Sequence, residues 1–406
     1  MIIGFAIILL GGFISGRLFK SLGLPALLGA LALGVLMGPY YINILPEGLL
    51  SSGADLRMIA LIIILLRAGL GLDRELLAEV GSVALRMSFL PCLLEGSVAT
   101  AAAMYFLKMP FAEAGMLGFI LAAVSPAVVV PAMLSLQKKG LGMAKGVPVI
   151  VLAGAALDDA FAITLFSAFV GLASQGTFGG PLQVPLQLVW AVLGGVLMGL
   201  GAFIAFRTLS RWLKASRAED SMLALGLALG AAVMGEHLAA SGPLAALVFG
   251  FILLEKLPRQ ASRVDQHLTD LWVGAQLMLF VLIGAAVQVP LIWSVGLLGS
   301  LVLALGLLAR SGGVFLALIG SELNIREKLF VALAYSPKAT VQAAIGGVPL
   351  ALGFASGPAI LAIAVLSIAV TAPLGAIAIE KAAPLLLQQS KRNTPAVAAS
   401  ITDEGE

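Results

Sequence analysis

The sequence predicts an all-α polytopic membrane protein with about 13 transmembrane helices. Of its 406 residues, 60% are hydrophobic and only 11% are charged, whereas soluble domains carry about 25% charged residues. A transmembrane helix needs about 20 mostly apolar residues, and the chain contains many such runs. The 47 glycines suit a bundle in which small residues let helix backbones approach closely. This composition excludes a soluble globular fold.

Apolar runs between polar breaks set the limits of the expected spans. The first run lacks a basic n-region and a small-residue cleavage site, so we interpret it as a retained span. The second and the ninth runs are short, which indicates tilted or partly interfacial helices. The thirteen expected spans are residues 2–19, 25–38, 56–72, 76–107, 111–136, 146–173, 184–209, 220–237, 243–256, 267–289, 291–320, 328–350 and 356–380.

The basic residues are unevenly distributed between the loops, which gives an independent test of this count. Cytoplasmic loops of membrane proteins are enriched in Lys and Arg. With the N-terminus outside, 18 of the 24 Lys and Arg residues fall on the cytoplasmic side, two outside (Arg57 and Lys108) and four within spans. We therefore expect a protein of the cell (inner) membrane with its C-terminus in the cytoplasm. The net charge of +3 reflects this topology and does not indicate nucleic acid as a partner.

Two spans carry a Ser-Pro pair in mid-membrane. Span five contains SPAVVVP (125–131), and span twelve contains SPKATVQ (336–342). Proline removes a backbone donor and clashes with the preceding helical turn. We therefore expect Pro126, Pro131 and Pro337 to break their helices. Broken helices at corresponding positions of two halves point to the binding site of a transporter.

The positions of these breaks indicate an internal repeat. Spans 1–6 and spans 8–13 would form the two halves, with span 7 linking them. Because the offset of seven spans is odd, the two repeats would have inverted orientations in the membrane. The alternative is a pair of unrelated proline kinks.

Oxygen atoms near the breaks are candidate ligands of a small hard cation. Unpaired backbone carbonyls and the hydroxyls of Ser125 and Thr340 would face a cavity there, and oxygen ligands suit such ions. His237, His267 and Cys92 have no ligand spacing. The pattern therefore does not favour a transition-metal site.

Two adjacent carboxylates lie inside an apolar run of span six, in the segment AALDDAFAI. Placing a charged residue within a span costs free energy, so such residues usually mark a functional site. Adjacent helical residues point about 100° apart, so Asp158 and Asp159 can face different neighbours. A carboxylate in a water-poor site can hold a proton or Na⁺, but not both at once. We interpret the pair as the Na⁺ and proton site; the alternative is two structural hydrogen bonds between helices.

Three further charged residues lie near mid-membrane or at a break. Glu95 of span four and Arg310 of span eleven occupy corresponding positions of the two halves, and we expect them to form an ion pair. Both a structural and a direct transport role are open for this pair. Lys338, directly after Pro337, would compensate the C-terminal dipole of a half-helix or a buried carboxylate. A structural and a titrating role are both open for this lysine.

These motifs resemble those of a known superfamily. VSPAVVVPAMLSLQ, LDDAF and YSPKATVQAAIG, together with LPCLLEG and the lone Arg310 of span eleven, resemble the monovalent cation:proton antiporter superfamily, in particular its NHA branch of sodium/proton exchangers. The resemblance covers nearly the whole hydrophobic chain. It implies an inverted-repeat fold with two crossed broken helices, a homodimer, and alternating access through an elevator-like movement of a core domain.

The resemblance also assigns roles to the charged residues. It implies that Asp159 is the principal ion ligand and that Asp158 assists it. In many members the first carboxylate pairs with a lysine of span eleven, where this chain has Arg310. Arginine stays charged and cannot lend a transferable proton. The Glu95–Arg310 pair resembles electroneutral members and the Asp-Asp pair resembles electrogenic ones, so both stoichiometries are open.

By resemblance, the chain divides into two kinds of domain. Residues 1–74 and 219–290 would form the dimerisation domain, and residues 75–175 and 291–385 the core domain. Residues 176–218 would form a linker helix between them. The polar composition of residues 386–406 predicts a disordered cytoplasmic tail.

Together these observations predict a sodium (or lithium)/proton antiporter, which is not an enzyme and needs no cofactor. Its partners would be monovalent cations, protons and membrane lipid. The alternatives on the same fold are potassium/proton exchange and sodium-coupled symport of an organic anion. An intramembrane aspartyl protease would need two carboxylates that converge from separate helices, whereas Asp158 and Asp159 diverge on one helix. A channel is disfavoured because the charges cluster at the breaks and form no ring.

Overall fold

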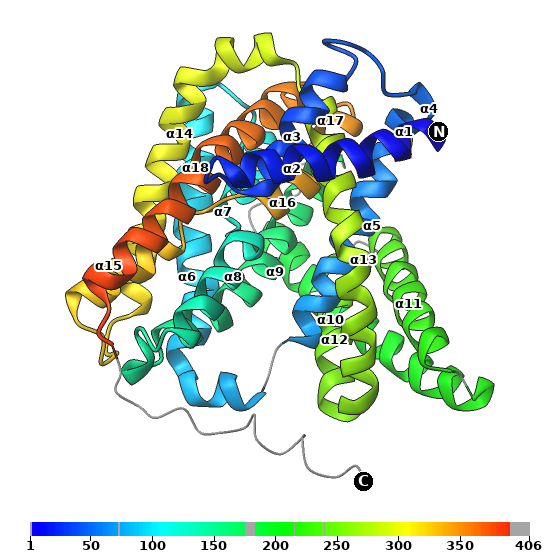
Figure 1. Ribbon diagram of the computed structural model, residues 1–406, viewed down its shortest axis with the longest axis vertical. Helices are drawn as coiled ribbons and strands as arrows, with labels where there is room; N and C mark the ends of the chain where they lie inside the picture. The colour runs from blue at the N-terminus through cyan, green and yellow to red at the C-terminus, as the bar shows by residue number, and fades with distance from the viewer. Residues whose placement is uncertain (1, 72–73, 175–182, 215, 239, 390–406) are drawn as a thin grey trace.

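The structure, a computed structural model, describes residues 2–71, 74–174, 183–214, 216–238 and 240–389. These residues form a bundle of helices (Figure 1), and no strand occurs among them. An isolated bridge joins Leu141 and Gln389. The predicted fold class, an all-α polytopic membrane protein, is confirmed.

In the first half of the chain, each expected span corresponds to one helix or to consecutive helices. Helix α6 is kinked at Gly81, where a left-handed φ of 55° favours glycine. The short helices α4 (Glu47–Ser51) and η2 (Met143–Lys145) lie in connections. The elements of the spans are α1 (Ile2–Ala6), η1 (Ile7–Gly11), α2 (Gly12–Ser21), α3 (Ala26–Met37), α5 (Gly53–Leu70), α6 (Arg74–Phe106), α7 (Phe111–Ala122), α8 (Pro126–Lys138) and α9 (Val147–Ser174).

The second half follows the same correspondence. Its elements are α10 (Gln183–Leu213), α11 (Arg217–His237), α12 (Gly242–Lys256), α13 (Pro258–Ala285), α14 (Val289–Ala317), α15 (Ile325–Ala334), α16 (Thr340–Ile345), α17 (Val348–Ala351) and α18 (Gly357–Leu386). Among the described residues, eight helical stretches are long and apolar enough to cross a membrane, and three shorter apolar helices accompany them. The count of 13 spans stays a prediction.

Two of the expected spans are interrupted helices. Residues 123–125 separate α7 from α8, and Ser125 has extended backbone angles of φ −94° and ψ 106° before Pro126 opens α8. Proline suits the first helical position because its missing N–H has no partner to lose there. Residues 335–339 separate α15 from α16 and contain Pro337. The breaks predicted at Pro126 and Pro337 are therefore confirmed.

Pro131 does not break its helix, and that prediction was wrong. It lies inside α8, which continues through it to Lys138. A proline in a helix interior removes one backbone hydrogen bond, and membrane helices tolerate this loss through neighbouring groups and local adjustment. The interruption of this span lies before Pro126, where the backbone of Ser125 is extended.

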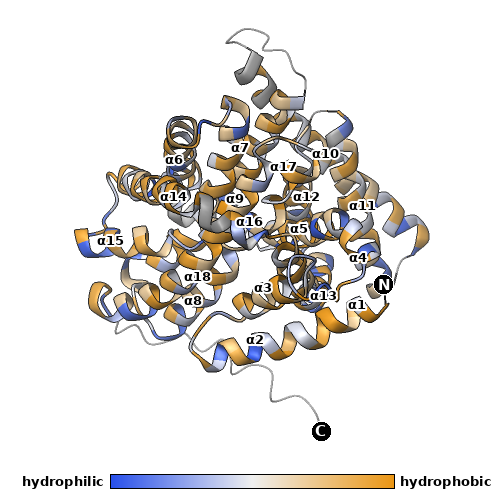
Figure 2. Ribbon diagram, turned by 90° about the horizontal axis from the view of Figure 1, so that it is seen from above, coloured by the Kyte–Doolittle hydropathy of each residue, from blue (hydrophilic) through white to orange (hydrophobic). Residues whose placement is uncertain are grey.

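The helices fall into two groups when viewed from above (Figure 2). The first, here named the α6 group, comprises α6–α9 and α14–α18, with α6 packed along α14. The second, the α5 group, comprises α3, α5 and α10–α13, with α5 packed against α12 and α13. Helices α9 and α16 lie between and contact helices of both groups. The two groups therefore meet along α16, which follows the second break, and along α9, which carries Asp158 and Asp159.

Glycines allow the close approach of helices within the α5 group. A Cβ atom on Gly69 of α5 would collide with the backbone carbonyl of Leu247 in α12, and one on Gly250 of α12 would collide with the carbonyl of Leu66. Each helix thus places a glycine where the other helix's backbone approaches. This reciprocal contact is the use of small residues that the composition predicted.

Arg57, which the count of basic residues placed on the outer side, lies near the start of the helix that forms span three. Asp55 favours a helix N-terminus there, and α5 begins at Gly53, three residues before the expected start. The Arg57 side chain is therefore part of the bundle and is only 8% exposed. Its guanidinium lies next to Gly347, at the joint between α16 and α17.

Candidate ion-binding site

The carbonyls at the end of α7 are held by side chains from other helices. Arg310 of α14 donates to the carbonyl of Ala122 through Nη1. Gln342 of α16 donates from Nε2 to the carbonyls of Ile120 (2.8 Å) and Ala123 (2.9 Å). We expected free carbonyls here as ion ligands, but these three already have donors. Backbone groups at membrane depth need such partners because no water replaces them.

The next two residues of the same break are held by their N–H groups. The Val124 N–H donates to Oδ2 of Asp158 on α9 at 3.1 Å. The Ser125 N–H donates to the carbonyl of Pro337 in the second break at 2.9 Å. The two broken helices therefore cross at their breaks, as the resemblance implied.

A network of four charged side chains surrounds this crossing. Arg310 pairs with Glu95 through Nη1 at 2.8 Å and with Asp158 through Nη2 at 2.8 Å. Lys338 Nζ pairs with the same Glu95 oxygen at 2.6 Å. All four side chains are at most 1% exposed. Two carboxylates and two cations balance in charge, which buried ions require.

The structure brings four of the residues that the sequence analysis singled out into contact, namely Glu95, Asp158, Arg310 and Lys338. The expected ion pair of Glu95 and Arg310 is present. Of the two partners considered for Lys338, a helix dipole and a buried carboxylate, the side chain contacts the carboxylate of Glu95. The backbone N–H of Lys338 donates to Thr371 Oγ1 of α18 at 2.8 Å. The ion pair of Asp158 with Arg310 adds a link that the sequence analysis did not anticipate.

Asp159 differs from its neighbour in forming no ion pair with the residues that the structure describes. Its side chain is 4% exposed, and its Oδ1 has no hydrogen-bond partner. The hydroxyls of Ser125 and Thr340, at the two breaks, are also buried without a partner. A carboxylate and two hydroxyls are oxygen ligands of the kind that Na⁺ and Li⁺ take. An ionised Asp159 adds one negative charge to a balanced network, and one bound Na⁺ or proton would neutralise it.

No transition-metal cluster is found in the part of the chain that the structure describes. There, no three His, Cys, Asp or Glu side chains gather in a group that could hold a metal. Cys92 is buried and free.

Two residues of the site were missed in the sequence. Tyr335 accepts a hydrogen bond from Arg310 Nε through its carbonyl, and its ring lies 5.2 Å from the guanidinium. Gln342 bonds the two broken helices together. A possible signal for both was their place in YSPKATVQ, where they are the polar side chains at either end of the break motif.

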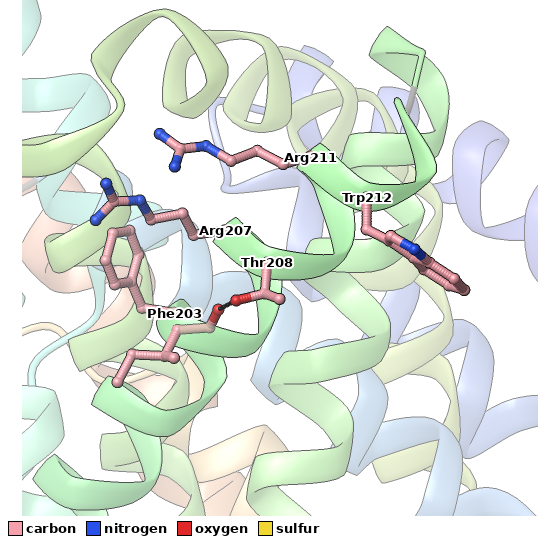
Figure 3. Close-up of a pocket in the computed structure, with 6 residues that line it drawn as sticks. Phe203, Arg207, Thr208, Arg211 and Trp212 are labelled. Atoms are coloured by element: carbon pink, nitrogen blue, oxygen red, sulfur yellow. Dashed lines mark hydrogen bonds between the residues drawn. The ribbon is translucent and has the colours of Figure 1, made fainter.

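The surface pocket shown in Figure 3 lies away from this site, on α10. Its lining includes Phe203, Arg207, Arg211 and Trp212. The two arginines extend side by side, while Trp212 points the other way (Figure 3). None of its lining residues belongs to the charged network, so the candidate site is the crossing of the two breaks.

Two crossed broken helices with buried carboxylates at their breaks define an ion transporter of the membrane-embedded kind. Comparison with known proteins gives the family. The family described as "Sodium/hydrogen exchanger, transmembrane" matches residues 5–382. The chain therefore belongs to the sodium/hydrogen exchanger family, within the monovalent cation:proton antiporter superfamily.

Individual relatives agree with this assignment. The chain is 37% identical to Sodium/hydrogen exchanger 9B2 of Xenopus tropicalis over 367 residues, covering 87% of this chain and 66% of that protein. It is 37% identical to Sodium/hydrogen exchanger 9B2 of Homo sapiens over 389 residues, covering 90% and 70%. The chain thus spans about two thirds of the length of these relatives.

A solved structure shares the fold. The sodium proton antiporter MjNhaP1 from Methanocaldococcus jannaschii superposes with a TM-score of 0.78 at 22% sequence identity, covering 94% of this chain and 96% of that one. At this identity the likeness concerns the arrangement of helices alone.

Proposed function

We propose that this protein exchanges Na⁺ or Li⁺ for protons across the membrane, with both cargoes competing for Asp159. The observation that carries the proposal is the contrast between two adjacent carboxylates. Asp158 pairs with Arg310, whereas its neighbour Asp159 is buried with an unpartnered oxygen. A site that needs one positive charge can accept a proton or an alkali cation in turn, which is the basic requirement of an antiporter.

The proposed ligands lie on elements of both halves of the chain. Asp159 belongs to α9, Ser125 precedes α8 and Thr340 opens α16. Asp158, which precedes Asp159 in α9, would assist it. Asp158 also accepts a hydrogen bond from the Val124 N–H and so helps to hold the first break in position. Both interrupted helices belong to the proposed core domain, so an ion held between them would be carried with that domain.

Alternating access would occur by an elevator-like movement of the core domain (75–175 and 291–385) against the dimerisation domain (1–74 and 219–290), with 176–218 as linker. The division of the helices into the α6 group and the α5 group supports this proposal. Exposed apolar side chains along α1–α2, among them Ile3 and Ile14, support contact with lipid or with a second subunit of a homodimer. The basic loops support an N-terminus outside and a C-terminus in the cytoplasm of the cell membrane.

Stoichiometry depends on Lys338 in this proposal. If Lys338 keeps its proton throughout, one Na⁺ replaces one proton at Asp159 and exchange is electroneutral. If Lys338 releases its proton when Na⁺ binds, two protons move for each Na⁺ and exchange is electrogenic. Arg310 stays charged in both cases.

The test is ion flux in proteoliposomes of the purified protein under a clamped membrane voltage. Proton movement is measured against gradients of Na⁺, Li⁺ and K⁺ in turn. We expect Na⁺ and Li⁺ to drive it and K⁺ not to. Flux driven by K⁺ alone would favour potassium/proton exchange, and Na⁺ uptake without opposite proton movement would favour symport.

The pH dependence of the same flux tests the competition. Each unit of pH is a tenfold change in proton activity, so below the pH where protonation dominates, the apparent KM for Na⁺ should rise about tenfold per unit for each competing proton. At high pH the maximal rate should fall, because no proton is available for the return step. An apparent KM independent of pH would contradict a shared site.

A further inference from the structure

Gln342 is the one uncharged amide side chain bonded to the crossing of the breaks in the described part of the chain. It lies in the first turn of α16, two residues after Thr340, and is fully buried. Its Nε2 donates to the carbonyls of Ile120 and Ala123, at 2.8 and 2.9 Å. The side chain therefore ties the start of α16 to the end of α7.

These two hydrogen bonds fix which way the amide faces. A flipped amide would direct its oxygen at two carbonyl oxygens, which cannot donate. The nitrogen must therefore face Ile120 and Ala123, and the oxygen must face away from them. That oxygen, Oε1, is buried and has no hydrogen-bond partner. A buried acceptor without a donor is costly, so its retention needs a reason.

The surroundings of Gln342 suggest what this oxygen contacts. Ala123, which the amide binds, is followed by Val124, which is bonded to Asp158, and by Ser125 with its unpartnered hydroxyl. Thr340, on the same first turn of α16, also has an unpartnered hydroxyl. The region of the crossing therefore holds several buried side-chain oxygens without partners.

We propose that Gln342 Oε1 is a ligand of the transported cation and helps to set its preference among alkali ions. The inference rests on the proposed function and extends its ligand set beyond the residues named there. An amide oxygen is a hard, neutral ligand that suits Na⁺ and Li⁺. It coordinates without adding charge, so one bound cation still neutralises Asp159. The amide nitrogen meanwhile anchors the oxygen to the neighbouring helix, which gives the ligand a fixed position.

Two substitutions test coordination by Oε1, one by removing this oxygen and one by making it ionisable. Gln342→Met keeps the approximate volume and removes both the oxygen and the donor. Gln342→Glu keeps the shape and adds an ionisable oxygen. The matched control is Gln260→Met, since Gln260 also donates two side-chain hydrogen bonds but to Ser210 and Asp220, outside the crossing.

The measurement is Na⁺- and Li⁺-driven proton flux in proteoliposomes as a function of pH. For Gln342→Met we expect the apparent KM for Na⁺ to rise by about tenfold or more and the ratio of the Li⁺ and Na⁺ values to change. For Gln342→Glu we expect a second competing proton, so the rise of apparent KM per pH unit should steepen from about tenfold towards a hundredfold. Gln260→Met should leave the ratio and the slope unchanged.

A purely structural role would give a different pattern. It would lower the thermal unfolding temperature and alter Na⁺ and Li⁺ transport in proportion, with no change in the pH slope, and this result would overturn the inference. If Gln342→Met does not fold, Gln342→Glu and the shorter Gln342→Asn are judged by the same ratio and slope. Absence of Na⁺-driven flux in the unsubstituted protein would instead overturn the proposed function.

Discussion

The α5–α12 contact and the crossing of the two breaks are held together by different means. At the first, glycines such as Gly69 and Gly250 bring backbones into contact, and neighbouring apolar side chains fill the space. At the second, ion pairs and side-chain hydrogen bonds secure extended backbone, and several oxygens have no partner. Tight apolar packing makes the first region rigid. The crossing has polar atoms free to bind an ion, so we expect substitutions in the two regions to have different consequences.

The largest loss of stability is expected at the crossing, from Glu95→Gln. This change leaves Lys338 without a carboxylate and Arg310 with only Asp158. Removing one partner of a buried ion network typically costs about 3–5 kcal/mol. The thermal unfolding temperature of the purified protein should fall accordingly. The matched control is Glu113→Gln, because Glu113 accepts from the backbone N–H of Ser356 and forms no ion pair with any described residue; its cost should stay at about 1 kcal/mol.

A double-mutant cycle sharpens this result. Arg310→Ala alone should destabilise by a similar amount, since it leaves Glu95 and Asp158 short of positive charge. The combined Glu95→Gln, Arg310→Ala protein should be less destabilised than the sum of the two single changes. Strict additivity would mean that the two side chains do not interact, in conflict with their 2.8 Å contact.

An intermediate effect is expected at the α5–α12 contact. Gly69→Ala places a methyl group against the backbone of Leu247, which cannot move aside as a flexible side chain could. Overpacking of this kind costs about 1–3 kcal/mol, and we expect it to appear as lower thermal stability with an unchanged apparent KM for Na⁺. Gly226→Ala is the control, because nothing lies within 4 Å of the added Cβ; it should be neutral or stabilising by up to about 1 kcal/mol. A large rise in KM for Gly69→Ala would blur the distinction between the two regions.

The sequence predicted the helical regions and the breaks because their signals are local. Apolar runs mark helices in a membrane, and Ser-Pro at Ser125 and Ser336 marks the interruptions. Intramembrane charge is also a local signal, which is why Glu95, Arg310 and Lys338 could be singled out. The sequence could not predict which side chains of different helices come into contact at the site. The Asp158–Arg310 pair depends on how α9 and α14 cross, and no spacing within either helix encodes that.

Two positions show where the local sequence is insufficient. Pro131 was expected to break a helix, yet a proline kinks or merely interrupts bonding according to what surrounds it. Arg57 was counted on the outer side, and its burial within the bundle could not be predicted from the sequence. At both positions tertiary contacts decide between outcomes that the local sequence permits.

The smallest effect is expected from Pro131→Ala. The structure places this residue inside α8 and outside the break. Alanine would restore one backbone hydrogen bond, which contributes about 0.5–1.5 kcal/mol. Stability should therefore stay the same or rise slightly, and exchange should be unaffected in liposomes. Loss of exchange with intact folding would show that Pro131 contributes to the movement of the break after all.

The central claim is that Na⁺ and protons share Asp159, and the most direct test is Na⁺-driven proton flux by Asp159→Asn in proteoliposomes. Asparagine keeps the size but removes both the charge and the titration. The account predicts that this protein folds and no longer exchanges Na⁺ for protons. Asp158→Asn is the neighbouring control: Arg310 retains Glu95, so exchange should be impaired but retained. Undiminished, pH-dependent exchange by Asp159→Asn would contradict the account.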